Sequence, residues 1–215
     1  MDVVLSNMPE YLAGFLVTLR LLVISGIAAI IIGTIVAVFR ISPIAALRTG
    51  ASVYTEIVRN TPLTLVLFFC SVVLPMLGSR LPFEVAAIVG LSVYTSPFIA
   101  EALRSGINGV PLGQAEAARS LGLGFGQSIT HVVFPQAFRM VMPPLINALI
   151  ALTKNTSVAG GFFVVELVAV GKNLANGHGD AVIPILVGVA IFYLIITVPL
   201  GLIAGRIERK LVMQR

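Results

Sequence analysis

The residues best suited to binding a charged ligand form one polar cluster, Lys154-Asn155-Thr156-Ser157, directly after an apolar stretch. A lysine and three hydrogen-bonding side chains are costly in an apolar setting and by default indicate a functional site. If a helix breaks here, free N–H groups near Thr156 and Ser157 would hold a carboxylate. The alternative is that the cluster only caps the break, and both interpretations stay open.

Other reactive residues lack the spacing that catalysis or metal binding needs. The chain has no Gly-x-x-x-x-Gly-Lys-Ser/Thr run, so no loop for nucleotide phosphates is predicted. The glycines of residues 122–126 follow a helical segment and lack the spacing of a dinucleotide fingerprint. His131 and His178 are expected on opposite sides of a membrane, and the single Cys70 has no second thiol. We therefore expect no enzyme activity, metal site or cofactor in this chain.

Composition places most of the chain in a lipid bilayer. Of its 215 residues, 58% are hydrophobic and 11% are charged, which is more apolar surface than a soluble domain of this size uses. A membrane-spanning helix needs about 20 mostly apolar residues. We therefore predict an all-α integral membrane protein, a single transmembrane domain over residues 1–215. Its five predicted spans lie near residues 12–39, 61–77, 83–103, 128–152 and 183–204.

Positive residues between the spans predict the orientation, because Lys and Arg are enriched in cytoplasmic loops. No Lys or Arg precedes Arg20, so a cleaved signal peptide is not expected. The eight-to-two distribution puts the N-terminus outside and the C-terminus in the cytoplasm, and it explains the net charge of +5 without nucleic-acid binding. The predicted cytoplasmic side carries Arg40, Arg48, Arg104, Arg119, Arg206, Arg209, Lys210 and Arg215, and the outer side carries Arg80 and Lys172.

Local patterns add four expectations. Thr61 is expected to cap the second span, whose first turn would hold Pro62. Glu101 and Arg104, three residues apart, are expected to pair on one helical face. The arginine at position 20 is expected to extend towards the lipid headgroups. Residues 162–170, too short to span, are expected to form a half-helix that carries Glu166 and precedes an outer loop at residues 171–180.

A polar, glycine-rich segment at residues 116–135 interrupts the apolar pattern. It is expected outside the bilayer, because irregular backbone that faces lipid would leave amide groups unpaired. The segment contains Glu116-Ala117-Ala118, then Gly122, and further on Val132, Phe134 and Pro135. Small alanines permit close contact with another protein, and Gly122 permits a turn. This spacing resembles the permease signature of type I ABC importers, in which the loop forms a coupling helix seated in a groove of the ATPase.

The resemblance covers nearly the whole chain. Gly14-x-x-x-Thr18-Leu19, Arg59-Asn60-Thr61-Pro62-Leu63, and the motifs within residues 94–107 and 113–118 are similar to the polar amino acid permeases, most of all the actinobacterial glutamate-uptake permeases. Leu65-Val66 departs from the glutamine that many relatives carry. The resemblance implies the type I permease fold and the import of acidic or other polar L-amino acids by alternating access.

It also implies partners and a location. Two ABC ATPase subunits would bind ATP and magnesium and dock on the coupling loop at residues 108–127. A second permease subunit, identical or paralogous, would complete the pore, and an extracellular solute-binding protein would deliver substrate. The chain would be a multi-pass protein of the bacterial plasma (inner) membrane. The implied ATPase-coupling residues are Gly113, Glu116, Ala117, Ala118, Leu121 and Gly122, and the implied substrate-binding residues are Lys154, Asn155, Thr156, Ser157, Glu166, Arg59, Thr61 and Thr95.

Asn155 carries the argument for an acidic substrate. Many permeases for basic or neutral amino acids have aspartate at this position, and an asparagine removes repulsion towards an acidic side chain. Glu166 would meet the substrate ammonium or pair with Lys154. Two alternatives stay open: an ion-coupled secondary amino acid carrier that works without an ATPase, and a membrane scaffold that only recruits one.

Overall fold

The computed structural model describes residues 2–79 and 81–212, and every regular element in these two ranges is a helix. The predicted all-α class is therefore confirmed. Arg80 and Arg215, two of the residues used to predict the orientation, lie outside the described residues. The elements are α1 Asp2–Ser6, α2 Met8–Arg40, α3 Ala45–Asn60, α4 Leu63–Phe68, the π-helix η1 Phe69–Val73, α5 Leu74–Met76, α6 Phe83–Asn108, α7 Leu112–Ser120, α8 Phe125–Gln127, the π-helix η2 Ser128–Val133, α9 Phe134–Asn155, the 3-10 helix η3 Thr156–Gly161, α10 Leu167–Gly177 and α11 Val182–Val212.

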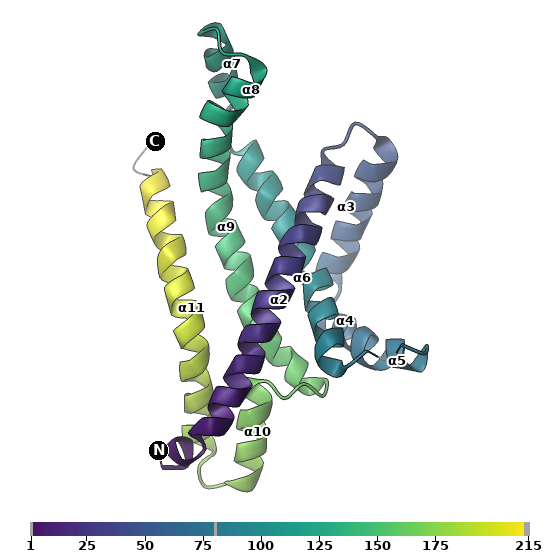
Figure 1. The fold of residues 1–215 in the computed structure, drawn as a ribbon, viewed down its shortest axis with the longest axis vertical. Helices are drawn as coiled ribbons and strands as arrows, with labels where there is room; N and C mark the ends of the chain where they lie inside the picture. The colour runs from purple at the N-terminus through teal and green to yellow at the C-terminus, as the bar shows by residue number, and fades with distance from the viewer. Residues whose placement is uncertain (1, 80, 213–215) are drawn as a thin grey trace.

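The long helices α2, α6, α9 and α11 run along the long axis of the molecule (Figure 1). At one end, α7 and α8 project beyond the other helices, and the C-terminal end of α11 lies on the same side. At the opposite end lie α10 and the N-terminus. The polar segment at residues 116–135 therefore lies at an end of the helical bundle.

The long helices are apolar enough to cross a membrane. Four segments qualify by length and composition: Met8–Arg40, Phe83–Asn108, Phe125–Gly161 and Val182–Lys210. A fifth candidate is the bent pair Ala45–Asn60 and Leu63–Met76, whose two parts meet at 101°. The described residues thus contain four candidate spans by length and composition, or up to five if the bent pair counts as one.

Close packing fixes α6 between α2 and α9. A Cβ added at Gly33 of α2 would lie 2.7 Å from Cβ of Ile99 on α6, closer than side chains approach one another. Gly106 of α6 packs in the same way on Val141 of α9. Small residues allow helix backbones to approach closely in membranes. This packing holds the polar residues of α6 in a fixed position between its neighbours.

The expectation that Thr61 caps the second span is wrong. Pro62 holds the N-cap position of α4, and no side chain caps that helix. The Thr61 hydroxyl instead donates 2.8 Å to the Ile57 carbonyl, at the end of α3. A threonine hydroxyl competes for the carbonyl one turn earlier, and here that local hydrogen bond forms.

The predicted half-helix at residues 162–170 begins too early. After η3, the backbone has a left-handed residue at Phe163, with φ of 66°, and α10 starts only at Leu167. The helix then continues to Gly177, so most of the predicted outer loop at residues 171–180 is helical. Glu166 explains why α10 starts at Leu167: it is the N-cap residue, and its side chain accepts hydrogen bonds from the first free N–H groups of the helix.

The structure also shows which side chains Arg104 and Arg20 contact. The Glu101–Arg104 ion pair is confirmed, with the expected spacing of three residues. Arg20 reaches across to α6, where its Nε lies 2.5 Å from Glu84 Oε1. The arginine in the first long helix is thus neutralised by a carboxylate on a neighbouring helix.

Candidate functional site

Helices α3, α6 and α9 line an open cavity of about 540 Å³, here called the first cavity. It brings together three of the predicted substrate-binding residues: Arg59, Thr95 and Asn155. The complete lining is Arg59, Tyr94, Thr95, Phe98, Glu101, Ala102, Ser105, Pro144, Asn147, Ala148, Ala151, Leu152 and Asn155. A volume of this size holds a small molecule, and a lining of aromatic, aliphatic and a few polar groups is typical of ligand sites.

Arg59 supplies the positive charge of the first cavity. It lies in the last turn of α3, directly before the bend to α4. Its guanidinium carbon is 5.5 Å from the centroid of the Phe98 ring, a cation–π arrangement. Among residues 2–79 and 81–212, no carboxylate forms an ion pair with Arg59. The guanidinium group can therefore bind an anion.

Thr95 contributes a hydroxyl group with no partner. The residue is 2% exposed, and in the described part of the chain its Oγ1 makes no hydrogen bond. A buried polar group without a partner is unusual in a folded protein, because desolvation costs about 1–3 kcal/mol. Thr95 belongs to the cavity lining, and its oxygen is covered in the observed rotamer, so a rotation of the side chain is needed before a polar group of a ligand can bond to it.

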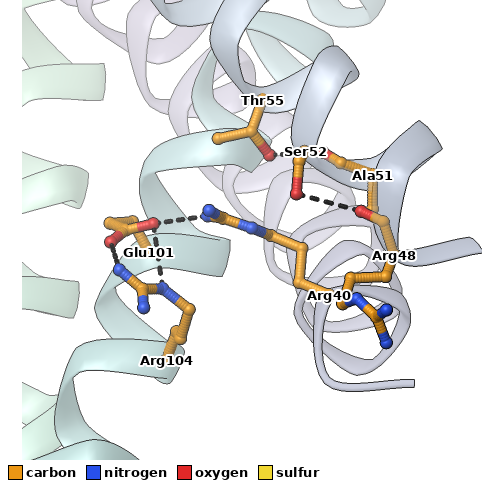
Figure 2. Close-up of polar contacts among 7 residues, drawn as sticks. All are labelled: Arg40, Arg48, Ala51, Ser52, Thr55, Glu101 and Arg104. Carbon is orange, nitrogen blue, oxygen red and sulfur yellow. Dashed lines mark hydrogen bonds and ion pairs between the residues drawn. The ribbon is translucent and has the colours of Figure 1, made fainter. Parts of the chain in front are cut away.

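Glu101 is the carboxylate of the first cavity, and two arginines neutralise it (Figure 2). Arg40, at the end of α2, approaches to 2.5 Å, and Arg104 pairs from the next turn of α6. Neither Arg40 nor Arg104 belongs to the lining of the cavity. The negative charge is thus balanced from outside the cavity, and Arg59 leaves a net positive charge at the site.

A second cavity of about 410 Å³ lies beside α9, α10 and α11. Lys154 and Ser157, both predicted to bind substrate, are in its lining and not in that of the first cavity. Lys154 is exposed, and no carboxylate of the described residues pairs with it. The lining is Lys154, Ser157, Val168, Ala190, Tyr193, Leu194 and Thr197. The predicted polar cluster is therefore divided between two cavities, because successive helical residues point in different directions.

Three predicted substrate-binding residues line neither cavity. The Thr61 hydroxyl donates to the Ile57 carbonyl of α3, and Thr156 is buried with its hydroxyl donating to the Thr153 carbonyl at 2.7 Å. Glu166 is 0% exposed and accepts hydrogen bonds from backbone N–H groups and a tyrosine. The expected alternative of a Lys154–Glu166 ion pair is wrong, since none forms between these two described residues.

The predicted coupling segment forms α7 and the turn that follows it. The N–H of Leu123 donates to the Ala118 carbonyl and that of Gly122 to the Arg119 carbonyl, the pattern of a Schellman motif. Gly122 has φ of +86°, a left-handed conformation that glycine adopts without steric cost. The helix therefore ends where the sequence pattern required a turn.

Of the six predicted coupling residues, five are exposed at the projecting end of the molecule: Gly113, Glu116, Ala117, Leu121 and Gly122. Ala118 is 4% exposed and faces the chain itself. Leu112 and Leu121 are each 84% exposed and Phe125 is 75% exposed. An apolar surface of this kind, on a polar segment outside the apolar helices, is typical of a protein-binding site.

Sequence reasoning missed several residues of the first cavity, above all Tyr94, Phe98 and Asn147. Tyr94, Phe98, Glu101 and Ser105 follow each other at intervals of three and four residues, which places them on one face of α6. This face combines aromatic and polar residues inside an otherwise apolar helix. That periodic pattern was the available signal.

Comparison with known proteins gives a consistent result. Residues 12–213 match the family described as binding-protein-dependent transport system inner membrane component. The chain is 43% identical, over 96% of each sequence, to the glutamate transport system permease protein GluC of Corynebacterium glutamicum. It is 38% identical to the probable glutamine ABC transporter permease protein GlnM of Bacillus subtilis, over 98% of this chain and 97% of that protein.

A solved structure extends the similarity to three dimensions. The crystal structure of an amino acid ABC transporter with histidines superposes with a TM-score of 0.86 at 26% identity, over 96% of both chains. A chain of the MetNI methionine ABC transporter in an inward-facing conformation shares the fold, with a TM-score of 0.71 at 22% identity.

Proposed function

Because the chain belongs to the family of binding-protein-dependent transport system inner membrane components, a class of multi-pass, non-enzymatic permeases, we propose that it is the transmembrane permease of an ATP-driven importer for glutamate or another acidic L-amino acid. The observation that carries the substrate class is the pairing, in one cavity, of an unpaired guanidinium group and an unpartnered hydroxyl group. The names of the relatives, glutamate and glutamine permeases, support the same class.

The groups of the first cavity match the parts of an acidic amino acid. Arg59 would hold a carboxylate in bidentate fashion, and the hydroxyl of Thr95 would donate to it or to the second carboxylate. The aromatic rings of Tyr94 and Phe98 offer faces to an ammonium group. Glu101 adds acceptor oxygens for the same ammonium group. An acidic amino acid has a net charge of −1, which complements the net positive charge of the cavity.

Lys154 and Ser157 have a different proposed place. They line the second cavity, which opens on the surface of α9 and α11. A lysine without a counterion is costly beside lipid. We propose that the second permease subunit, identical or paralogous, covers this surface, so that Lys154 faces a passage between the two subunits and attracts the anionic substrate.

Energy would come from two ABC ATPase subunits, which bind ATP and magnesium and dock on α7. The exposed residues Glu116, Ala117 and Leu121 would enter a groove of the ATPase, and the buried Ala118 would let α7 pack on its own loop. Movement of α7 would reach the first cavity through α6, which ends only four residues before α7 begins.

The proposed topology counts five spans, with the bent pair of α3 and α4 as one of them. The N-terminus and α10 would lie outside, facing a solute-binding protein, and α7 would lie in the cytoplasm. This orientation follows the excess of basic residues on the α7 side, and the location is the bacterial plasma (inner) membrane.

The test is ATP-dependent uptake of labelled L-glutamate by the complete complex in proteoliposomes. We expect Arg59→Gln to abolish uptake while Arg48→Gln, which removes an exposed positive charge from the start of the same helix, leaves it unchanged. Glu116→Lys should abolish uptake and substrate-stimulated ATP hydrolysis without preventing membrane insertion. Uptake by the chain alone, driven by a proton or sodium gradient, would contradict the proposal and favour an ion-coupled carrier.

A further inference from the structure

A buried carboxylate outside both cavities connects three helices. Glu166 precedes α10, and its two oxygens accept from the N–H groups of Val168 and Ala169, each at 2.9 Å. The hydroxyl of Tyr193 on α11 donates to the same carboxylate at 2.9 Å. Thr18 of α2 accepts from the N–H of Leu167 at 3.2 Å. Residues from α2, α10 and α11 thus meet at Glu166.

The chain around this carboxylate leaves little room for movement. Gly160 of η3 lies so close to Glu166 Oε1 that a Cβ at this position would collide with it. A Cβ at Gly14 of α2 would lie 2.8 Å from Cγ2 of Val170. Both approaches are closer than real side-chain contacts. The start of α10 and the turn of η3 are therefore held against α2 and against each other.

Tyr193 links the buried carboxylate to the second cavity. Its side chain lies in the lining of that cavity with Lys154 and Ser157, while its hydroxyl points to Glu166. Lys154 and Asn155 are the last residues of α9, which continues into η3 with helical backbone angles. Because successive helical residues point in different directions, Lys154 lines the second cavity and Asn155 lines the first cavity. The position of the last turn of α9 therefore determines where both side chains lie.

We infer that Glu166 is a positioning residue: through its contacts with Tyr193, the start of α10 and Gly160 of η3 it fixes the end of α9, which continues into η3, and thereby places Asn155 and Lys154 for the substrate. Glu166 does not touch the substrate in this arrangement, because it is fully buried and lines neither cavity. The inference rests on the proposed function, since it assigns how that site is held in shape.

Tyr193→Phe is the most selective test, because it removes one hydroxyl group and keeps the ring. Tyr11→Phe is a matched control. The Tyr11 hydroxyl is buried and connects α2 with α11, by donating 3.0 Å to the Ile185 carbonyl, but it is not bonded to Glu166. Each variant loses one hydrogen bond to α11, fully buried for Tyr11 and partly buried for Tyr193, so a purely structural role predicts an effect of Tyr11→Phe at least as large as that of Tyr193→Phe.

The measurement is equilibrium binding of labelled L-glutamate to the purified permease–ATPase complex in detergent, together with its thermal unfolding midpoint. We expect both variants to lower the midpoint by similar amounts, and Tyr193→Phe alone to raise the Kd, by about fivefold or more, since small displacements of binding groups have effects of this order. Glu166→Gln, which keeps one acceptor oxygen, should raise the Kd in the same direction.

Three outcomes are decisive. A Kd that rises only in the Tyr193 and Glu166 variants supports the inference. Equal Kd values in wild type, Tyr193→Phe and Tyr11→Phe, with glutamate bound in all three, would overturn the inference and leave the proposed function intact. A wild-type complex that binds no acidic amino acid would overturn both.

Discussion

Arg40 and Glu101 lie 61 residues apart in the sequence, and their side chains meet at 2.5 Å (Figure 2). The arginine ends α2, and the glutamate faces the first cavity from α6. With Arg104 on its other oxygen, the Glu101 carboxylate has a positive partner on each side. The ion pair therefore joins the end of α2 to α6, and it balances a negative charge beside the proposed substrate.

We expect Arg40→Gln to weaken glutamate binding more than glutamine binding, because Glu101 would then repel an acidic side chain more strongly. The variant should also lose about 1 kcal/mol of stability or less, since the pair is only partly buried. Competition binding with the two amino acids measures the selectivity. Arg48→Gln is the control, because Arg48 donates to the Ser42 carbonyl and pairs with no described carboxylate. An unchanged ratio of the two affinities would contradict the charge argument.

Gly122→Ala should weaken coupling without disturbing the first cavity. The left-handed backbone at this position costs a residue with a Cβ about 1–2 kcal/mol, although the Cβ itself would meet no neighbouring atom. The end of α7 would therefore rearrange and present Leu121 differently to the ATPase. We expect reduced substrate-stimulated ATP hydrolysis and unchanged glutamate binding.

Gly126→Ala is the matched control for this change. Gly126 lies in the same projecting segment, also has free space around it, and has no left-handed backbone. If both glycine variants lose coupling equally, the turn conformation is not the cause, and contact of this surface with a partner would explain the loss.

Asn155→Asp should reverse the preference for acidic substrates. The new carboxylate would face the first cavity, where the positive charge of Arg59 would then be shared between the protein and the ligand. We expect a lower affinity for glutamate and a relative gain for glutamine or arginine, measured by competition binding. Ser157→Asp places a charge two residues away in the lining of the second cavity. An equal loss of glutamate affinity in both variants would show that position within the first cavity does not matter.

The sequence was sufficient for the fold class because apolar length is a strong signal: the described part of the chain contains four helices long and apolar enough to span a membrane. The turn at Gly122 was also predictable, since a glycine directly after a helix commonly adopts the left-handed conformation that ends the helix. The family could be recognised from residue spacing alone, because the Glu-Ala-Ala motif and the glycine and proline that follow it lie within one short segment. These features depend on neighbouring residues.

The composition of the cavities was less predictable, because it depends on contacts between distant segments. The sequence grouped Lys154 with Asn155, whereas the structure places them in different cavities. It could not reveal that Arg40 reaches Glu101, or that Glu166 is enclosed by α2, α10 and α11. A buried carboxylate and an exposed one look the same in a sequence. The proposed substrate role of Arg59, Thr95 and Asn155 stays a prediction until binding is measured.

Thr95→Val gives the sharpest test of the first cavity, because the hydroxyl group it removes has no partner in the described part of the chain. Removing a buried, unsatisfied polar group is neutral or stabilising for a protein, so the empty complex should unfold at the same temperature or higher. If the hydroxyl bonds to the ligand, the same variant should bind glutamate about tenfold more weakly, the equivalent of one hydrogen bond to a charged group at about 1.5 kcal/mol or more.

Ser71→Ala provides the comparison that separates these two effects. Ser71 carries the other buried hydroxyl without a partner among the described residues, but it lies in η1 and does not line the first cavity. Its removal should likewise leave the stability unchanged or raised, with glutamate affinity as in wild type. Equal affinities for wild type, Thr95→Val and Ser71→Ala would mean that the Thr95 hydroxyl is not a ligand-binding group, and the substrate would have to be held elsewhere in the cavity.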